Sequence, residues 1–181
     1  IIKGEKLESF FLEKTQNKMM TQVCIPLVIT STDIQSGKGI YFSSEPPNYQ
    51  DLSTESFISD VAIGKAIRAS IGIPVVFQPK DIYINHKHFL VDGGIVNNLP
   101  MGILRRMGAD KIIGINLGYS GQQEKQIDNF LEIGTQSIDI MMYHMTELQK
   151  QLYHIPEINS KNKYKDRSLG TERGIIINPH I

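Results

Sequence analysis

The chain has 181 residues, a length typical of a single domain. Its 19 basic and 19 acidic side chains cancel, so bulk charge attracts it neither to nucleic acid nor to an anionic membrane. Cys24 is the only cysteine, which excludes an intrachain disulfide, and its place at the start of an apolar run predicts a buried thiol.

The N-terminal part predicts a helix and two strands. Apolar residues at helical spacing predict a helix over 4–17. An apolar run predicts a strand over 26–33, and a glycine-rich turn leads to a second strand over 39–42. No apolar run reaches the ~18–20 residues of a membrane-spanning helix. The first residues also lack the organisation of a signal peptide.

The middle of the chain begins with a stretch rich in Pro, Ser and Asp over 43–56, which predicts a loop. At about 14 residues it is longer than most connections, so a mobile functional loop and a plain surface insertion are equally supported. Ser59 and Asp60 are suitable caps for a helix that runs to Ser70 and ends before Gly72.

A hairpin is predicted next, with strands over 81–84 and 88–91, and it ends in Asp92-Gly93-Gly94. An acid followed by two glycines at a strand end holds a carboxylate at the rim of a sheet, where open α/β folds carry out their chemistry. The glycines leave room for another backbone or a substrate to come close. The motif alone is also an ordinary hairpin turn.

The C-terminal part alternates helices and strands. Helices are predicted over 100–107 and 124–152, a buried parallel strand over 111–117 and a last strand over 174–177. The methionines of the long helix favour a core position, with a lipid-binding face as the minority alternative. A basic cluster over 161–167 is interpreted as a solvated loop.

Three blocks carry a resemblance to a known family. They are residues 66–79, AIRASIGIPVVFQP, residues 88–100, HFLVDGGIVNNLP, and residues 107–116, MGADKIIGIN. Together they resemble the C-terminal half of a patatin-like phospholipase domain, and the similarity extends over roughly residues 4–118. The combined spacing is far more specific than any one block.

The resemblance implies an α/β fold, a three-layer sandwich with a mainly parallel central sheet. It implies a lipid acyl hydrolase with a Ser-Asp dyad and no cofactor. Asp92 matches the base of that dyad, and Gly93 and Gly94 would let the nucleophile turn pack against it. The implied partner is a lipid ester at a membrane or micelle surface, with no nucleic acid. A cytoplasmic location is expected, with peripheral contact with a membrane left open.

The nucleophile of that dyad is missing here. The family carries its serine in Gly-x-Ser-x-Gly, and no such motif occurs in the 181 residues. Ser70 and Ser120 lack the required spacing. We therefore expect residues 1–181 to be the C-terminal portion of a single domain, inactive alone, with the serine upstream of Ile1. The alternative is a non-catalytic module for lipid or protein contact.

Other sites have less support. His86 and His88 form a His-x-His in the hairpin, but two ligands without a neighbouring Cys or carboxylate are a weak metal site, so exposed turn histidines are favoured and no metal is predicted. The chain has no P-loop, and the glycines after residue 113 do not form a dinucleotide fingerprint.

Overall fold

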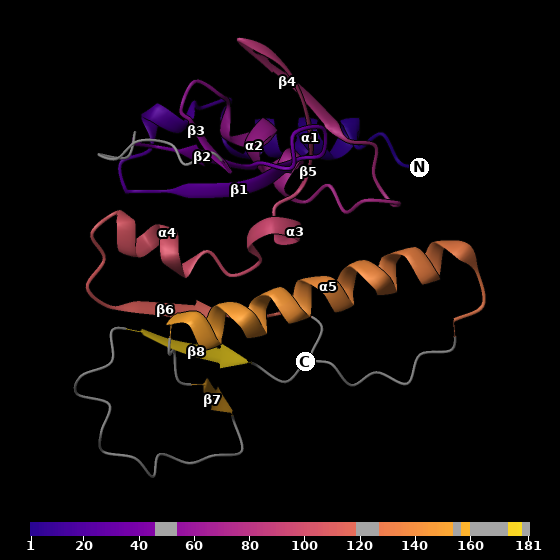
Figure 1. Cartoon of the computed structure of the whole chain (residues 1–181). Coiled ribbons are helices and arrows are strands. Elements are labelled where there is room, and N and C mark those ends of the chain that lie inside the picture. The colour runs from indigo at the N-terminus through magenta and orange to yellow at the C-terminus, as the bar shows by residue number, and fades with distance from the viewer. Residues whose placement is uncertain (46–53, 119–126, 154–156, 160–173, 179–181) are drawn as a thin grey trace.

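The computed structural model of the chain describes residues 1–45, 54–118, 127–153, 157–159 and 174–178 (Figure 1). Its helices are α1 (Glu5–Lys14), η1 (Met20–Gln22), α2 (Ile63–Ser70), α3 (Gly94–Asn97), α4 (Met101–Arg106) and α5 (Phe130–Tyr153). Its strands are β1 (Val28–Asp33), β2 (Gly39–Ser43), β3 (Glu55–Ile58), β4 (Lys80–Ile84), β5 (His86–Asp92), β6 (Ile112–Ile115), β7 (Glu157–Asn159) and β8 (Gly174–Asn178).

Two sheets organise these elements. The larger has the strand order β3-β2-β1-β5-β4, and the smaller has the order β6-β8-β7. Helix α2 packs on β1 and β5, and α1 packs on α2. Figure 1 shows α1 and α2 on one face of the larger sheet, and α3, α4 and α5 on the other. The smaller sheet lies beyond these three helices, so the predicted α/β class is confirmed.

The strand directions correct one part of the prediction. In the larger sheet β1 pairs antiparallel with both β2 and β5, and β5 pairs antiparallel with β4; only β2 and β3 run parallel. A mainly parallel sheet is therefore wrong here, because a hairpin and a short turn join neighbouring strands directly. The smaller sheet is wholly parallel, as was predicted for β6.

The main core lies between α2 and the larger sheet. Its buried apolar side chains are Met20, Ile40, Phe42, Ile58, Val61, Ala66, Ala69, Ile82 and Leu90. Alanines on the inner face of α2 let the helix approach the strands closely. A second, smaller core joins the α4 region to the β6–β8 pair, through Leu99, Met101, Ile112 and Ile176.

Two local predictions are wrong, and two others fall on residues outside the described ones. Helix α2 begins after Ala62, so Ser59 and Asp60 are not its caps, because β3 occupies residues that the sequence places in the loop and at the helix start. Residues 46–53 of the predicted loop, and the basic cluster over 161–167, lie outside the described residues. Cys24 is exposed, because the chain enters the sheet only at Val28.

The long helix is also less buried than its pattern predicts. It begins at Phe130, and much of its apolar surface faces outward: Met141 is 58% exposed and Leu152 is 72% exposed. A core position for the whole stripe is therefore wrong within the described residues. Within the described residues, α5 packs chiefly against the short helix α3.

Candidate active site

Asp92 is the last residue of β5, and the sheet holds its main chain. Its partner across the antiparallel pair is Ser31 of β1, whose hydroxyl donates to the carbonyl of Val91 at 2.7 Å. The Asp92 N–H donates to the carbonyl of Gly72, just after α2, at 3.0 Å. The backbone at Asp92 is thus fixed from both the sheet and the helix layer.

The Asp92 carboxylate is half-buried and only partly satisfied. Its Oδ1 accepts a hydrogen bond from the N–H of Gly94 at 2.8 Å. Burial raises the pKa of the Asp92 carboxyl above its ordinary 3.8, although the Gly94 N–H opposes that change. Among the described residues, Oδ2 has no hydrogen-bond donor, so one oxygen remains able to accept a proton.

The two glycines after Asp92 are required by space. Gly93 has a helical φ of −68°, so a side chain would fit its backbone conformation. A Cβ there would, however, fall within 2.5 Å of the Thr30 carbonyl group. At Gly94 a Cβ would overlap the Met142 methyl group and come within 3.1 Å of Asp92 Oδ1. The turn therefore packs directly on β1 and beneath α5.

The two asparagines after the turn fasten α5 over it. Asn98 Nδ2 donates to the Thr146 hydroxyl at 3.0 Å, and Gln149 donates to Asn97 Oδ1 at 2.8 Å. Asn97 Nδ2 also donates to the Tyr41 hydroxyl at 3.1 Å. These contacts give both asparagines a structural role, and no side chain caps α4. Their attachment to α5 could not be predicted from local sequence.

A charged group supports this network from β3. Arg106 binds the Glu55 carboxylate with both terminal nitrogens, at 2.6 and 2.9 Å, and Glu55 accepts from the Tyr41 hydroxyl at 3.4 Å. Burial raises the pKa of the Tyr41 hydroxyl, so it stays protonated. The network connects β2, β3, α4 and α3, and so fixes the turn from the side of the larger sheet.

An apolar groove adjoins the turn. It has a volume of about 380 Å³, and its lining is almost wholly apolar: Ile95, Ile138, Ile140, Met141, Met142, His144, Met145 and Leu148. Ile95 follows the turn directly, and Met142 closes over Gly94. The groove thus has room for a hydrocarbon chain next to the turn that follows Asp92.

The predicted site residues and the serines occupy different places. Asp92, Gly93 and Gly94 form one turn at the C-terminal end of β5, an interior strand of the larger sheet. Ser70 ends α2, while Ser120 lies outside the described residues. Among the described residues no helix is both long enough and apolar enough to cross a membrane.

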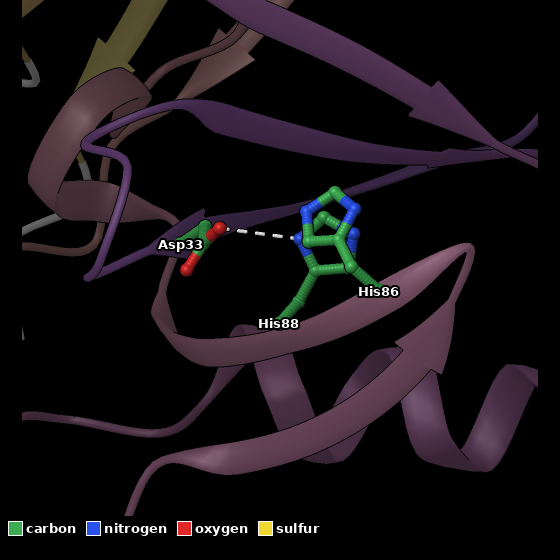
Figure 2. Close-up of side chains that lie close together, drawn as sticks. All are labelled: Asp33, His86 and His88. Atoms are coloured by element: carbon green, nitrogen blue, oxygen red, sulfur yellow. Dashed lines mark hydrogen bonds and ion pairs between the residues drawn. The ribbon is translucent and has the colours of Figure 1, made fainter.

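The surroundings of His86 and His88 contradict the expectation that these histidines have no neighbouring carboxylate. Their hairpin does have a carboxylate neighbour, because Asp33 at the end of β1 lies 3.1 Å from His88 through Oδ2 and Nδ1 (Figure 2). His88 is also buried, so an exposed turn histidine is wrong for it, while His86 is exposed as expected. Asp33 is 55 residues away in sequence, and only the pairing of β1 with β5 reveals the contact.

Comparison with known proteins adds a family match. The family model described as patatin-like phospholipase matches residues 4–105. An uncharacterised NTE family protein of Mycobacterium bovis is 29% identical over 120 residues, which cover 66% of this chain and 28% of that protein. Patatin-like phospholipase domain-containing protein 7 of Rattus norvegicus is 36% identical over 76 residues, 40% of this chain and 5% of that protein.

A human relative matches the chain over a similarly short segment. Patatin-like phospholipase domain-containing protein 6 of Homo sapiens is 36% identical over 69 residues, which cover 36% of this chain and 5% of that protein. The chain therefore spans less than a third of the length of each of these relatives.

Proposed function

Because the chain belongs to the patatin-like phospholipase family, we propose that it contributes the base of a lipid acyl hydrolase. Asp92 is the base of a Ser-Asp dyad in this proposal, and the serine is supplied by sequence upstream of Ile1. The whole protein is then an esterase of the phospholipase A type.

The observation that carries the proposal is that the Asp92 carboxylate is half-buried and, among the described residues, has a hydrogen-bond donor on only one of its oxygens. A carboxylate is a weak base in water, with an unperturbed pKa of ~3.9. Burial raises the pKa of Asp92, and only one of its oxygens has a donor among the described residues. Both features favour acceptance of a proton from a serine hydroxyl brought to Oδ2.

The chemistry follows from those positions. Asp92 takes the serine proton as the serine oxygen attacks the acyl carbonyl carbon, and then returns that proton to the departing alcohol. Water next releases the acyl group, again with Asp92 as base. Gly93 and Gly94 keep the Asp92 turn packed against β1 and α5, since any Cβ there would collide with Thr30 or Met142.

The substrate class follows from the groove. Its lining is aliphatic and methionine-rich, and its Met142 lies over Gly94. A fatty acyl chain in the groove would place its ester near Asp92. Methionine side chains adapt to irregular apolar surfaces, which suits chains of several lengths.

The second candidate is a non-catalytic module for lipid or protein contact. The observation in its favour is the sequence itself, which has no Gly-x-Ser-x-Gly in 181 residues. In that case the exposed apolar side of α5 would be the contact surface and Asp92 would have no chemical role.

The two candidates are separated by Asp92→Asn in the protein that includes the upstream sequence. We expect ester hydrolysis to fall ~10²–10⁴-fold, the usual cost of losing a general base, with the melting temperature little changed. The matched control is Asp81→Asn, which makes the same change at an exposed carboxylate on β4 and should keep full activity. Unchanged hydrolysis by Asp92→Asn would refute the proposal.

The 181-residue chain alone provides a further test. We expect it to hydrolyse neither a nitrophenyl ester nor a phospholipid. Turnover by this chain that is abolished by Asp92→Asn would place the nucleophile within it, and Ser70 would be the first serine to replace.

A further inference from the structure

Three potential metal ligands converge at one end of the hairpin, away from the turn at Asp92. His86 and His88 are two residues apart on β5, so they lie on the same face of the strand. Asp33, the last residue of β1, points at them (Figure 2). One ligand atom from each residue can be chosen such that all three lie within 4.8 Å of one another.

The distances suit a small cation. Asp33 Oδ2 and His88 Nδ1 are 3.1 Å apart, and the two imidazole rings have centroids 4.1 Å apart. Ligands of a tetrahedral zinc ion lie ~2.0–2.1 Å from the metal and therefore roughly 3.3 Å from one another. The Asp33–His88 pair already has that spacing, and exposed His86 is able to turn toward it.

The Asp33 carboxylate is held in place before any cation binds. Its Oδ1 accepts from the N–H of Gln35 at 3.2 Å and from the N–H of Phe89 at 3.4 Å, while Ser36 donates to Oδ2 at 2.9 Å. Surrounding hydrogen bonds of this kind fix the direction of a ligand and strengthen metal binding. Asp33 and His88 are both more than nine-tenths buried.

The donor set selects the class of cation. Two imidazole nitrogens and one carboxylate oxygen suit zinc and similar transition ions, whereas calcium and magnesium prefer oxygen ligands alone. Three protein ligands with one side open to solvent, as at exposed His86, leave a fourth position for water or another small ligand.

His86 distinguishes a metal site from a structural hydrogen bond. The Asp33–His88 contact alone would connect β1 to β5 and needs no third residue. The placement of a second imidazole ring against His88, with a nitrogen within reach of the same carboxylate, is explained by a shared cation. We propose that Asp33, His86 and His88 bind one divalent cation of the zinc class.

The test is a titration of the purified, chelator-treated protein with zinc chloride, followed by calorimetry. We expect one zinc per chain at micromolar or tighter affinity, and a higher melting temperature when zinc is present. His86→Asn should weaken binding at least ~10-fold, the loss seen even for residues that only orient a ligand. Because His86 is exposed, that variant should keep the fold.

The matched control is His144→Asn, which removes an exposed histidine of α5. It should bind zinc like the unaltered protein. Cobalt in place of zinc should give visible absorption bands that His86→Asn removes. Absence of binding up to ~100 µM zinc would overturn the proposal, and so would equal affinity of His86→Asn and the unaltered protein. An equal loss in both variants would mean scattered surface binding only, which also overturns it.

Discussion

Asp33 and Asp92 end two neighbouring strands of one sheet, yet their surroundings differ. Asp33 is 3% exposed and its carboxylate has four hydrogen-bond donors, namely Gln35, Ser36, His88 and Phe89. Burial raises the pKa of the Asp33 carboxyl, but the four hydrogen bonds outweigh burial and hold the pKa below 3.8.

Asp92 has the opposite balance. Its only donor among the described residues is the Gly94 N–H, so burial prevails and raises the pKa of its carboxyl. Burial raises the pKa of both carboxyls, and the opposing hydrogen-bond donors within the described residues number four at Asp33 and one at Asp92. A saturated carboxylate fixes structure or a cation, whereas an unsaturated one is available to move a proton.

The largest loss of stability is expected for a glycine in the turn after Asp92, and a smaller loss for a glycine in the turn after Asp33. Gly93→Ala should cost about 3 kcal/mol of unfolding free energy, because its Cβ would press on the Thr30 backbone. Gly37, in the turn after Asp33, has open space around it but a φ of +71°. Gly37→Ala should therefore cost only ~1 kcal/mol, the strain of a left-handed backbone. Urea unfolding of both variants measures the difference.

Substitution by asparagine distinguishes a steric clash, expected at Gly93, from backbone strain, expected at Gly37. Gly37→Asn should be nearly neutral, since asparagine tolerates the left-handed region, whereas Gly93→Asn should be at least as damaging as Gly93→Ala. If asparagine restored stability at Gly93, the turn would be limited by backbone conformation, and the close packing on β1 would be refuted.

The sequence predicted both turns, but it indicated a chemical role only for Asp92. Asp92-Gly93-Gly94 follows an apolar run and lies within a family motif, so local pattern was enough. Gln35 and Ser36 contact Asp33 from the adjacent turn, but His88 and Phe89 come from the hairpin. The pairing of β1 with β5 that brings these two residues to Asp33 leaves no local signal. The start of α2 was misplaced for a similar reason, because residues 55–58 pair with β2.

The exposed side of α5 shows a second limit of prediction. Apolar spacing predicts that Met141 and Leu148 are buried, yet each is 58% exposed. Periodicity indicates which side of a helix is apolar, but it does not indicate what covers that side. The ties from Asn97 and Asn98 to α5 depend on amide geometry, which has no periodic signal.

Replacement of each carboxylate by an amide should give unequal losses of stability. Asp33→Asn should lose ~1.5–3 kcal/mol of unfolding free energy, because an amide offers one acceptor oxygen where the carboxylate uses two. Asp92→Asn should be neutral or slightly stabilising, since the amide oxygen still accepts from Gly94 and no buried charge remains. Equal losses in urea unfolding would remove the proposed distinction between the two carboxylates.

The smallest expected effect is the pH dependence of the difference in unfolding free energy between the unaltered protein and each variant, Asp33→Asn or Asp92→Asn. For Asp33 the folded pKa lies below 3.8, so its contribution to stability is complete above 3.8 and is lost as pH falls through the folded pKa. For Asp92 the folded pKa lies above 3.8, so its contribution is complete below 3.8 and is lost as pH rises through the folded pKa. Unfolding free energies between pH 2 and pH 6 should therefore show the advantage of the unaltered protein over Asp33→Asn growing with pH. Its advantage over Asp92→Asn should shrink over the same range and level off above the folded pKa. If both differences changed with pH in the same direction, the hydrogen-bond donors would not decide the balance at these two strand ends, and Asp92 would lose its main physical support as a base.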